Sequence, residues 1–246
     1  MAGGTLSFLA ATGVANNLTV ARSGGFYLVR DLAAPVQASS GCVQTKTNVA
    51  RCAVSAVSSI EIDSGDGNDR AMLGDDVDGR LDGGAGNDQL WSGTGDAGLQ
   101  GGAGNDMLTP GTGTDVLAGG DGADTASYAD RTASSPVVVD IDGLADDGNS
   151  EDADGAGVRD NVQVDVERLI GGAGADDLTG SAIANRLTGG GGEDILRGLA
   201  GSDMLFASGD GGADTVLCGQ GAMDHAFADP VDTVSTAGPE RCEFVN

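Results

Sequence analysis

The sequence predicts an all-β protein built as a solenoid of short, stacked coils. Residues 83–127 divide without a gap into five units of nine residues. A fixed short period usually means that each unit forms one structural step that packs on its neighbours. The eighth position of the first four units holds leucine, and the first half of most units is rich in glycine. Turn and strand are therefore expected to alternate within each unit.

The two halves of a nine-residue unit are expected to form different local structures, a turn and a strand. Glycine at positions one, two and four allows positive φ angles, which turn backbone carbonyl groups to one side. The last three residues form a short strand, whose central side chain points inward while its two neighbours point outward. The core leucines of this pattern are Leu90, Leu99, Leu108 and Leu117. Two strands and two turns then close one coil of eighteen residues.

Aspartates recur at the sixth position, where the turn ends. Asp88, Asp106 and Asp124 are each eighteen residues apart. Successive coils therefore place them on one edge, about 4.8 Å apart if the strands keep ordinary sheet spacing. Bare carboxylates at that distance repel each other. Calcium binds oxygen ligands at about 2.3–2.6 Å, so an ion fits between stacked carboxylates, with turn carbonyls completing its shell.

The nonapeptide pattern resembles the repeat of the RTX (repeats-in-toxin), or haemolysin-type calcium-binding, family. The resemblance covers Asp63 to Ser127 and Gly171 to about Asp224. It implies a right-handed parallel β-roll in two repeat blocks, loaded with several Ca²⁺ ions. The candidate metal-binding positions are the acidic residues Asp69, Asp88, Asp106, Asp115, Asp124, Asp176, Asp194, Asp203, Asp214 and Asp224, together with the turn positions Gly83, Ala85, Gly101, Ala103, Gly119, Asp121, Gly171, Ala173, Gly189 and Gly191.

Residues 1–62 contain no repeat and are expected to form an amino-terminal β cap. The first coil of a roll exposes unpaired strand edges, which need a cover. Ser23-Gly24-Gly25 is a hairpin signal between two strand-like runs. The strand-like runs of this segment are Leu6 to Ala10, Asn17 to Arg22, Phe26 to Arg30 and Ser58 to Asp63.

The first repeat block, residues 63–127, is expected to have two unequal edges. One edge holds Asp69, Asp88, Asp106 and Asp124, whereas the other holds Gly79, Ala97 and Asp115. We therefore expect well-ordered calcium along the first edge and sparse calcium along the second. Asp78 and Asp96, each one position early, could strengthen the second edge by a local shift. Asp69 lies nineteen residues before Asp88, which predicts a single-residue bulge in that coil.

The period stops between residues 128 and 170. Pro136 to Ile141 and Val162 to Leu169 are each expected to form a strand. The acidic segment between them has two interpretations, a solvated loop or an additional calcium loop. Its residue order is not that of an EF-hand, so no ligand geometry follows. The candidate ligands are Asp142, Asp146, Asp147, Asp152 and Asp154.

Residues 171–217 form the second predicted repeat block, with leucines again at nine-residue spacing. Asp176 and Asp194 are expected on one edge, and Asn185 and Asp203 on the other. Asp214 and Asp224 depart from the phase by two and three residues. Residues 218–246 are expected to form a carboxy-terminal cap, in which Ala226, Phe227, Val231 and Val234 are available to cover the last coil.

Charge and cysteine content favour a secreted protein. The net charge is −26 and the isoelectric point is about 4.1, which disfavours nucleic acid and anionic membranes as partners. No segment approaches the length of a membrane span. The spacing of the four cysteines does not fit a zinc site, so disulfides are expected. Three pairings are open on paper, and Cys42–Cys52 with Cys218–Cys242 is preferred because each pair lies in its own terminal segment.

Two functional hypotheses follow. The first is a secreted calcium-binding protein with a structural, adhesive or cell-surface role, whose folding is driven by Ca²⁺. The alternative is an accessory calcium-binding domain of a secreted hydrolase or toxin. An enzymatic activity is not expected, since the sequence has one histidine and no serine within a G-x-S-x-G elbow. The protein or surface partner stays open.

Overall fold

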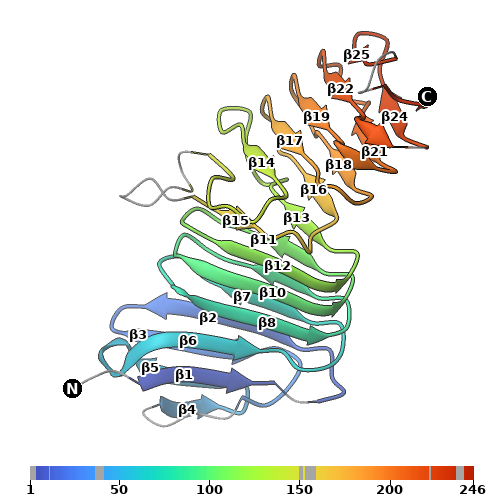
Figure 1. Cartoon of the computed structure of the whole chain (residues 1–246). Coiled ribbons are helices and arrows are strands. Elements are labelled where there is room, and N and C mark those ends of the chain that lie inside the picture. The colour runs from blue at the N-terminus through green and yellow to red at the C-terminus, as the bar shows by residue number, and fades with distance from the viewer. Residues whose placement is uncertain are drawn as a thin grey trace. The chain divides into compact units, whose positions relative to one another are not determined.

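We describe a computed structural model of the chain, in which residues 4–10, 12–36, 42–149, 152, 159–221, 223–236 and 241–246 are placed. These residues form two compact units, Met1–Asp124 and Thr125–Asn246, which we call unit 1 and unit 2. Strands dominate both units, and parallel strands stack in each as a β-solenoid (Figure 1). The predicted fold class is therefore confirmed. No helix among the placed residues is long and apolar enough to cross a membrane.

Unit 1 contains two stacks of strands joined by turns. One stack has the order β1-β6-β8-β10-β12 and the other the order β11-β9-β7-β2-β3-β5-β4. A short 3₁₀ helix, Val54–Ala56, precedes β6. The strands are β1 (Gly4–Leu9), β2 (Asn17–Ser23), β3 (Phe26–Asp31), β4 (Cys42–Lys46), β5 (Val49–Ala53), β6 (Val57–Asp63), β7 (Arg70–Leu73), β8 (Gly79–Ala85), β9 (Gln89–Trp91), β10 (Ala97–Gly104), β11 (Met107–Thr109) and β12 (Val116–Gly122).

The core of unit 1 is a pair of apolar columns, one from each stack. Leu81, Leu99 and Leu117 pair in register across β8, β10 and β12, and Leu90 pairs with Leu108 across β9 and β11. Each of these leucines is at most 1% exposed. The inward position predicted for the eighth residue of the repeat is therefore confirmed. Burying one such side chain stabilises the fold by about 1.5–3 kcal/mol.

The amino-terminal segment adds antiparallel pairing to the parallel coils. β1 pairs parallel with β6, and β2 pairs parallel with β7. β2, β3, β5 and β4 then pair antiparallel, and the hairpin predicted at Gly24-Gly25 joins β2 to β3. The predicted strands are present, whereas β4 and β5 were not predicted. The disulfide Cys42–Cys52 joins these two strands at a directly opposed pair.

The extra residue of the nineteen-residue coil lies in a turn. Met72 pairs with Trp91, nineteen residues on, whereas the Asp76 backbone N–H donates to Thr94 Oγ1, eighteen residues on. The additional residue is therefore absorbed between Met72 and Asp76. Asp76 has a φ of 56°, in the left-handed region, which aspartate tolerates better than most residues. Because the extra residue lies outside the strands, the core register is preserved.

Unit 2 repeats the two-stack design with parallel strands throughout. The stack orders are β13-β16-β18-β21-β24-β26 and β14-β17-β19-β22-β25, and β20 pairs with β23. The strands are β13 (Thr125–Ser127), β14 (Val138–Asp140), β15 (Asn161–Val162), β16 (Arg168–Ile170), β17 (Asp177–Thr179), β18 (Arg186–Thr188), β19 (Ile195–Arg197), β20 (Ala200–Gly201), β21 (Met204–Ala207), β22 (Thr215–Leu217), β23 (Gln220–Gly221), β24 (His225–Ala228), β25 (Thr233–Val234) and β26 (Phe244–Val245).

The segment predicted as one strand over Val162 to Leu169 is interrupted. It forms β15 and β16 with a turn between them, in which the Val166 N–H donates to the Gln163 carbonyl at 3.2 Å. Val164 is 60% exposed, whereas Val162 and Val166 are fully buried. The apolar pattern therefore marked a turn that buries two valines four residues apart, and the single-strand prediction was wrong.

Coils of unit 2 lengthen toward the carboxyl end, and each insertion falls in a turn. Ile195 pairs with Thr215, twenty residues on, and Met204 pairs with His225, twenty-one residues on. The stacking continues through β24, β25 and β26, so coil geometry extends through the segment expected to be a cap. Ala226 is fully buried there, whereas Val231 is 58% exposed. The predicted disulfide Cys218–Cys242 is present.

Candidate metal centres

A ladder of aspartates runs along one edge of unit 1. The backbone N–H of Asp69 donates to Asp88 Oδ1 at 2.7 Å, Asp88 donates in the same way to Asp106, and Asp106 donates to Asp124. Asn16 begins the ladder by donating its N–H to Asp69 Oδ1 at 2.6 Å. Every aspartate side chain therefore reaches back to the preceding coil. The predicted stacking of these four aspartates on one edge is confirmed.

The second carboxylate oxygen of these residues is buried without a hydrogen-bond donor. This holds for Oδ2 of Asp69, Asp88 and Asp106, whose exposures are 1%, 1% and 2%. A buried oxygen that loses water and gains no donor costs about 1–3 kcal/mol, and more when it is charged. The cost recurs at each rung. A cation at these oxygens would remove it.

The first glycine of a repeat leaves a cradle beside the carboxylate. A Cβ added to Gly83 would lie 2.5 Å from Asp88 Oδ2 and 2.5 Å from the Gly101 carbonyl oxygen. The same arrangement recurs in unit 2, where a Cβ on Gly171 would meet Asp176 Oδ2 and the Gly189 carbonyl. Only glycine keeps this space open. A carboxylate oxygen and a carbonyl oxygen of the next coil converge on it.

Burial makes these carboxylates hard to ionise without a cation. Burial raises the pKa of Asp88 to about 6, more than the Asp69 backbone N–H lowers it. The pKa values of Asp69 and Asp106 are also raised, chiefly by burial. A divalent ion would reverse this effect by supplying the missing positive charge. Oxygen-only ligands of this kind are those of a hard cation such as Ca²⁺, so the residues present fit the ion.

The turn positions predicted as carbonyl ligands lie next to the aspartate ladder. Gly101 follows Gly83 by one coil, and Ala85, Ala103 and Asp121 pair in register across β8, β10 and β12. The Ala103 carbonyl accepts the Gly86 N–H at 2.8 Å. The further positions Gly119, Gly171, Ala173, Gly189 and Gly191 occupy the matching turns of the later coils. Their role as ligands stays a prediction.

A second ladder runs beside the first in the opposite sense. At position five, the Asn87 N–H donates to Asn68 Oδ1 at 2.9 Å, and the Asn105 N–H donates to Asn87 Oδ1 at 2.7 Å. Here the later coil donates to the earlier one, whereas at position six the earlier coil donates to the later one. These exposed amides carry no charge. They tie the turns together without adding repulsion.

The other edge of unit 1 satisfies its polar groups internally. Asp115 Oδ1 accepts the Ala97 N–H at 2.8 Å, and its Oδ2 accepts the Ser92 hydroxyl at 2.8 Å. On this edge, Asp78 and Asp96 form a separate ladder at position five, in which Asp78 Oδ1 accepts the Asp96 N–H. They therefore tie turns together and do not replace the missing carboxylate. The predicted inequality of the two edges agrees with this geometry.

Unit 2 carries aspartate ladders on both edges. On one edge, each backbone N–H donates to the carboxylate that lies in the next coil. The donors are Val137, Asp176, Asp194 and Asp214, and their acceptors, in the same order, are Asp176, Asp194, Asp214 and Asp232. On the other, N–H groups of Asn185, Asp203 and Asp224 donate to Asp203, Asp224 and Glu243. Asp214 and Asp224, which depart from the repeat phase, therefore occupy ladder positions because the inserted residues lie in turns.

The chemistry of the rungs in unit 2 repeats that of unit 1. Oδ2 is buried without a donor in Asp194, Asp203, Asp214 and Asp224. Burial raises the pKa of Asp194 to about 7 and that of Asp203 to about 7. Asp176 differs, because its Oδ2 accepts the Gly172 N–H at 2.6 Å. Four rungs of this unit therefore present an oxygen that lacks a partner.

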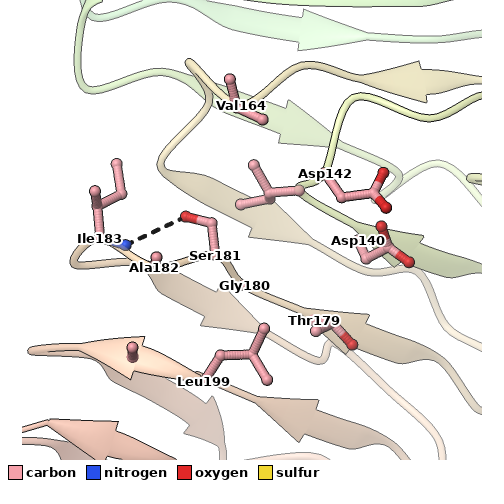
Figure 2. A pocket seen from close by; sticks show the side chains of 11 residues that line it. Asp140, Asp142, Val164, Thr179, Gly180, Ser181, Ala182, Ile183 and Leu199 are labelled. Carbon is pink, nitrogen blue, oxygen red and sulfur yellow. Dashed lines mark hydrogen bonds between the residues drawn. The ribbon is translucent and has the colours of Figure 1, made fainter.

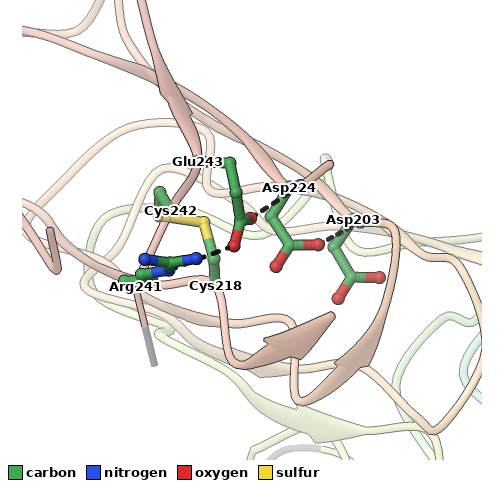
Figure 3. Close-up of a disulfide and its surroundings, with 6 residues drawn as sticks. All are labelled: Asp203, Cys218, Asp224, Arg241, Cys242 and Glu243. Atoms are coloured by element: carbon green, nitrogen blue, oxygen red, sulfur yellow. Dashed lines mark hydrogen bonds and ion pairs between the residues drawn. A yellow bond between two sulfur atoms is a disulfide. The ribbon is translucent and has the colours of Figure 1, made fainter. Parts of the chain in front are cut away.

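Sequence reasoning missed the last ladder residues, Asp232 and Glu243. Glu243 follows Cys242, so the disulfide to Cys218 holds it beside Asp224, and the Arg241 guanidinium lies 3.4 Å from its carboxylate (Figure 3). Both missed residues lie two positions before an apolar residue, Val234 or Val245. That spacing also separates Asp88 from Leu90. An acidic residue two positions before an apolar residue was therefore a usable signal, but it was missed because the prediction followed a fixed nine-residue count.

Several aspartates among the placed residues of the acidic segment, 140–149, 152, 159 and 160, accept hydrogen bonds. Asp152 is fully buried and accepts Arg131 Nη2 at 2.6 Å, and Asp160 accepts the Tyr128 hydroxyl at 3.1 Å. Asp147 accepts N–H groups of Asp140 and Val162, and burial raises its pKa to about 8. Asp142 accepts the Leu144 N–H. Asp154 lies outside the placed residues.

One group in this segment has the spacing of a metal site. Ligand atoms of Asp140, Asp146 and Asp147 lie within 4.8 Å of one another. Beside it is a pocket of about 570 Å³, which is lined by Asp140 and Asp142 at one end and by apolar side chains that include Ile183 and Leu199 at the other (Figure 2). Asp140 Oδ1 is the one oxygen of this group that is buried without a donor, and both oxygens of Asp147 accept backbone N–H groups. The group therefore offers a cation fewer unpartnered oxygens than the ladders do.

One family model matches the chain. The family, described as RTX calcium-binding nonapeptide repeat (4 copies), matches residues 73–108, 98–126 and 168–205. These ranges include the regular rungs of both units and end before Asp214. No curated protein matches the sequence.

Proposed function

We propose that this chain, which carries RTX calcium-binding nonapeptide repeats, is a secreted structural or cell-surface protein whose folding depends on Ca²⁺. Its β-solenoid fold and its repeats together make it a calcium-binding β-roll. Secretion, the dependence of folding on the ion and a non-enzymatic role are the parts that we propose. The ladder carboxylates support a structural role, because each is built into the backbone pairing of consecutive coils.

The observation that carries the proposal is the stack of buried carboxylate oxygens without donors. Asp88 and Asp106 in unit 1 and Asp194 in unit 2 each present such an Oδ2. Their ionised forms are costly in the folded state without a cation, and neighbouring rungs add mutual repulsion. Folding and ion binding are therefore expected to be a single equilibrium.

The ion would be held by residues of consecutive turns. The aspartates at position six would supply charged oxygens, and the first glycines of the repeats would supply carbonyl oxygens beside them. Bound calcium supplies positive charge that neutralises the rungs and joins adjacent coils. The glycines keep the space open, the carboxylate Oδ1 atoms orient the side chains, and the leucine columns fix the distance between coils.

Three features support a location outside the cytoplasm. Both cysteine pairs form disulfides, which persist in oxidising compartments. The net charge of −26 gives the chain a large requirement for counter-charge, and extracellular modules bind calcium at about 10⁻⁴–10⁻³ M. RTX repeats of this kind are also typical of extracellular proteins. The chain would then stay open at cytoplasmic calcium levels and fold after export.

A calcium titration of the chelated protein tests the proposal. Far-UV circular dichroism should report little strand signal in excess chelator, and the signal should rise cooperatively as free Ca²⁺ increases. Magnesium at the same ionic strength is the control, because it prefers a tighter octahedral shell and retains its water. An unchanged strand signal in chelator would refute the coupling of folding to calcium.

A further inference from the structure

A lengthened connection on one edge of unit 2, between β21 and β22, contributes a carboxylate that the repeat does not supply. Thr188 pairs with Phe206 at a separation of eighteen residues, whereas Ile195 pairs with Thr215 at twenty. Two extra residues therefore lie between Phe206 and Thr215. Asp210 lies in this longer connection, outside the nine-residue phase, and its side chain is exposed. The insertion adds an acidic residue beside the ladder.

Asp210 stands close to two rungs of the ladder. Ligand atoms of Asp194, Asp210 and Asp214 all lie within 4.8 Å of one another. For three atoms with this spacing there is a central position that lies within about 2.8 Å of each atom, which is close to the calcium–oxygen distance of about 2.3–2.6 Å. A single ion can therefore contact all three carboxylates after a shift of a few tenths of an ångström.

Two of these carboxylates each present a buried oxygen with no hydrogen-bond donor. Asp194 and Asp214 are each 1% exposed, and Oδ2 of both is buried without a donor. Their Oδ1 atoms accept the N–H groups of Asp176 and Asp194 and are held in place by them. Burial without a donor is an observation independent of the spacing of the three acids. Both indicate a bound cation.

Asp210 also takes the place of a backbone carbonyl. In unit 1, the N–H at position four of a repeat donates to the carbonyl at position three of the next coil, as Gly86 does to Ala103 and Gly67 does to Ala85. In unit 2, the corresponding N–H of Gly192 donates to Asp210 Oδ2 at 2.9 Å, and the Gly212 N–H donates to Asp210 Oδ1 at 3.0 Å. A charged carboxylate thus stands where these two turns of unit 1 have a neutral carbonyl. The insertion raises the ligand charge of this turn.

We propose that Asp194, Asp210 and Asp214 form a three-carboxylate calcium site that fills before the repeat sites of unit 1. The inference rests on the proposed calcium binding and adds a hierarchy to it. Ligand charge is one of the quantities that sets calcium affinity, and the sites along the Asp88 ladder have one carboxylate fewer. The first ion to bind would then close the coil that β19 and β22 build.

Calcium counting on the full-length protein tests this hierarchy. Native mass spectrometry at increasing free Ca²⁺ should show one ion bound before the others in the wild type. Asp210→Asn should raise the free calcium needed to half-fill that first site at least about tenfold, while later ions bind as before. Asp75→Asn is the matched control, because Asp75 is an exposed aspartate in the lengthened turn of unit 1.

The outcomes separate this inference from the proposed function. A first ion that binds equally well to Asp210→Asn, or a variant in which all ions weaken together, would overturn the three-carboxylate site and leave calcium-coupled folding intact. A wild type that binds no calcium and keeps its strand signal would overturn the proposed function itself. Circular dichroism at saturating calcium checks that Asp210→Asn is folded, which its exposed position favours.

Discussion

The two units place their carboxylates differently on the same coil design. Unit 1 has one complete acidic edge, and its other edge holds Ala97 and an Asp115 bonded to Ser92. Unit 2 has acidic ladders on both edges and an additional carboxylate from Asp210. The leucine columns are equally buried in both. The comparison shows that the core fixes the coil, whereas the turn residues decide how strongly it depends on cations.

The first prediction concerns pH in the presence of chelator and has the largest expected effect. In the folded state, burial raises the pKa of Asp88 to about 6 and those of Asp194 and Asp203 to about 7 from an ordinary value of 3.8. Their contribution to stability is therefore complete below about pH 3.8 and is lost as pH rises through 6 to 7. Metal-free protein should gain stability on acidification from pH 8 to pH 5.

Circular dichroism and tryptophan fluorescence in chelator at several pH values measure this effect in each unit, because metal-free protein should refold as these carboxylates become protonated. Trp91, the one tryptophan of the sequence, lies in β9 and reports unit 1, while circular dichroism reports both units. The loss of stability should extend to higher pH in the dichroism than in the fluorescence, because the pKa values of Asp194 and Asp203 in unit 2 are higher than that of Asp88 in unit 1. With calcium present the trend should reverse, because protons compete with the ion. The same trend with and without calcium would contradict the assignment of these carboxylates as ligands.

The second prediction closes one cradle. Gly83→Ala places a Cβ 2.5 Å from Asp88 Oδ2 and from the Gly101 carbonyl. We expect unit 1 to lose one bound calcium ion and about 1–3 kcal/mol of stability, the usual cost of overpacking. Gly98→Ala is the control, since its Cβ meets only the Arg80 side chain at 3.8 Å. Equal ion counts for the two variants by native mass spectrometry would show that the cradle holds no ion.

The third prediction converts the weak edge of unit 1 and has the smallest expected effect. Ser92→Gly combined with Ala97→Asp supplies both parts that this edge lacks, a first-position glycine and a sixth-position aspartate. The double variant should bind one additional calcium ion. Ala97→Asp alone should bind none, because the Ser92 side chain still fills the cradle and can donate to the new carboxylate. An unchanged ion count in the double variant would mean that further turn residues are required.

Much of the fold could be predicted because the repeat spaces its core residues regularly. Leu90 and Leu108 occupy equivalent places in consecutive coils, so one period defines strands, turns and the stacking register together. The position of Asp88 two residues before Leu90 fixes its side of the turn by the same geometry. The extra residue before Asp88 was also predicted, although it lies in a turn and not in a strand.

The sequence predicted less where coils lengthen. An insertion in a turn leaves the strand pairing unchanged but shifts every later residue out of a fixed count, which hid Asp232 and Glu243. The role of Asp210 depends on how the longer turn folds back toward Gly192, and no local pattern encodes that contact. The paired strands β4 and β5 were missed because their residues do not alternate clearly between apolar and polar.

The two hydrogen-bonded columns of unit 1 have a consequence for how such chains change length. In the asparagine column the donors point toward earlier coils, and in the aspartate column they point toward later coils. Their dipoles oppose each other, so lengthening the stack adds little net polarity, much as in a sheet whose strand dipoles alternate. A further coil therefore adds almost no net dipole to the stack, and the electrostatic cost of lengthening comes from the carboxylate that each new rung brings.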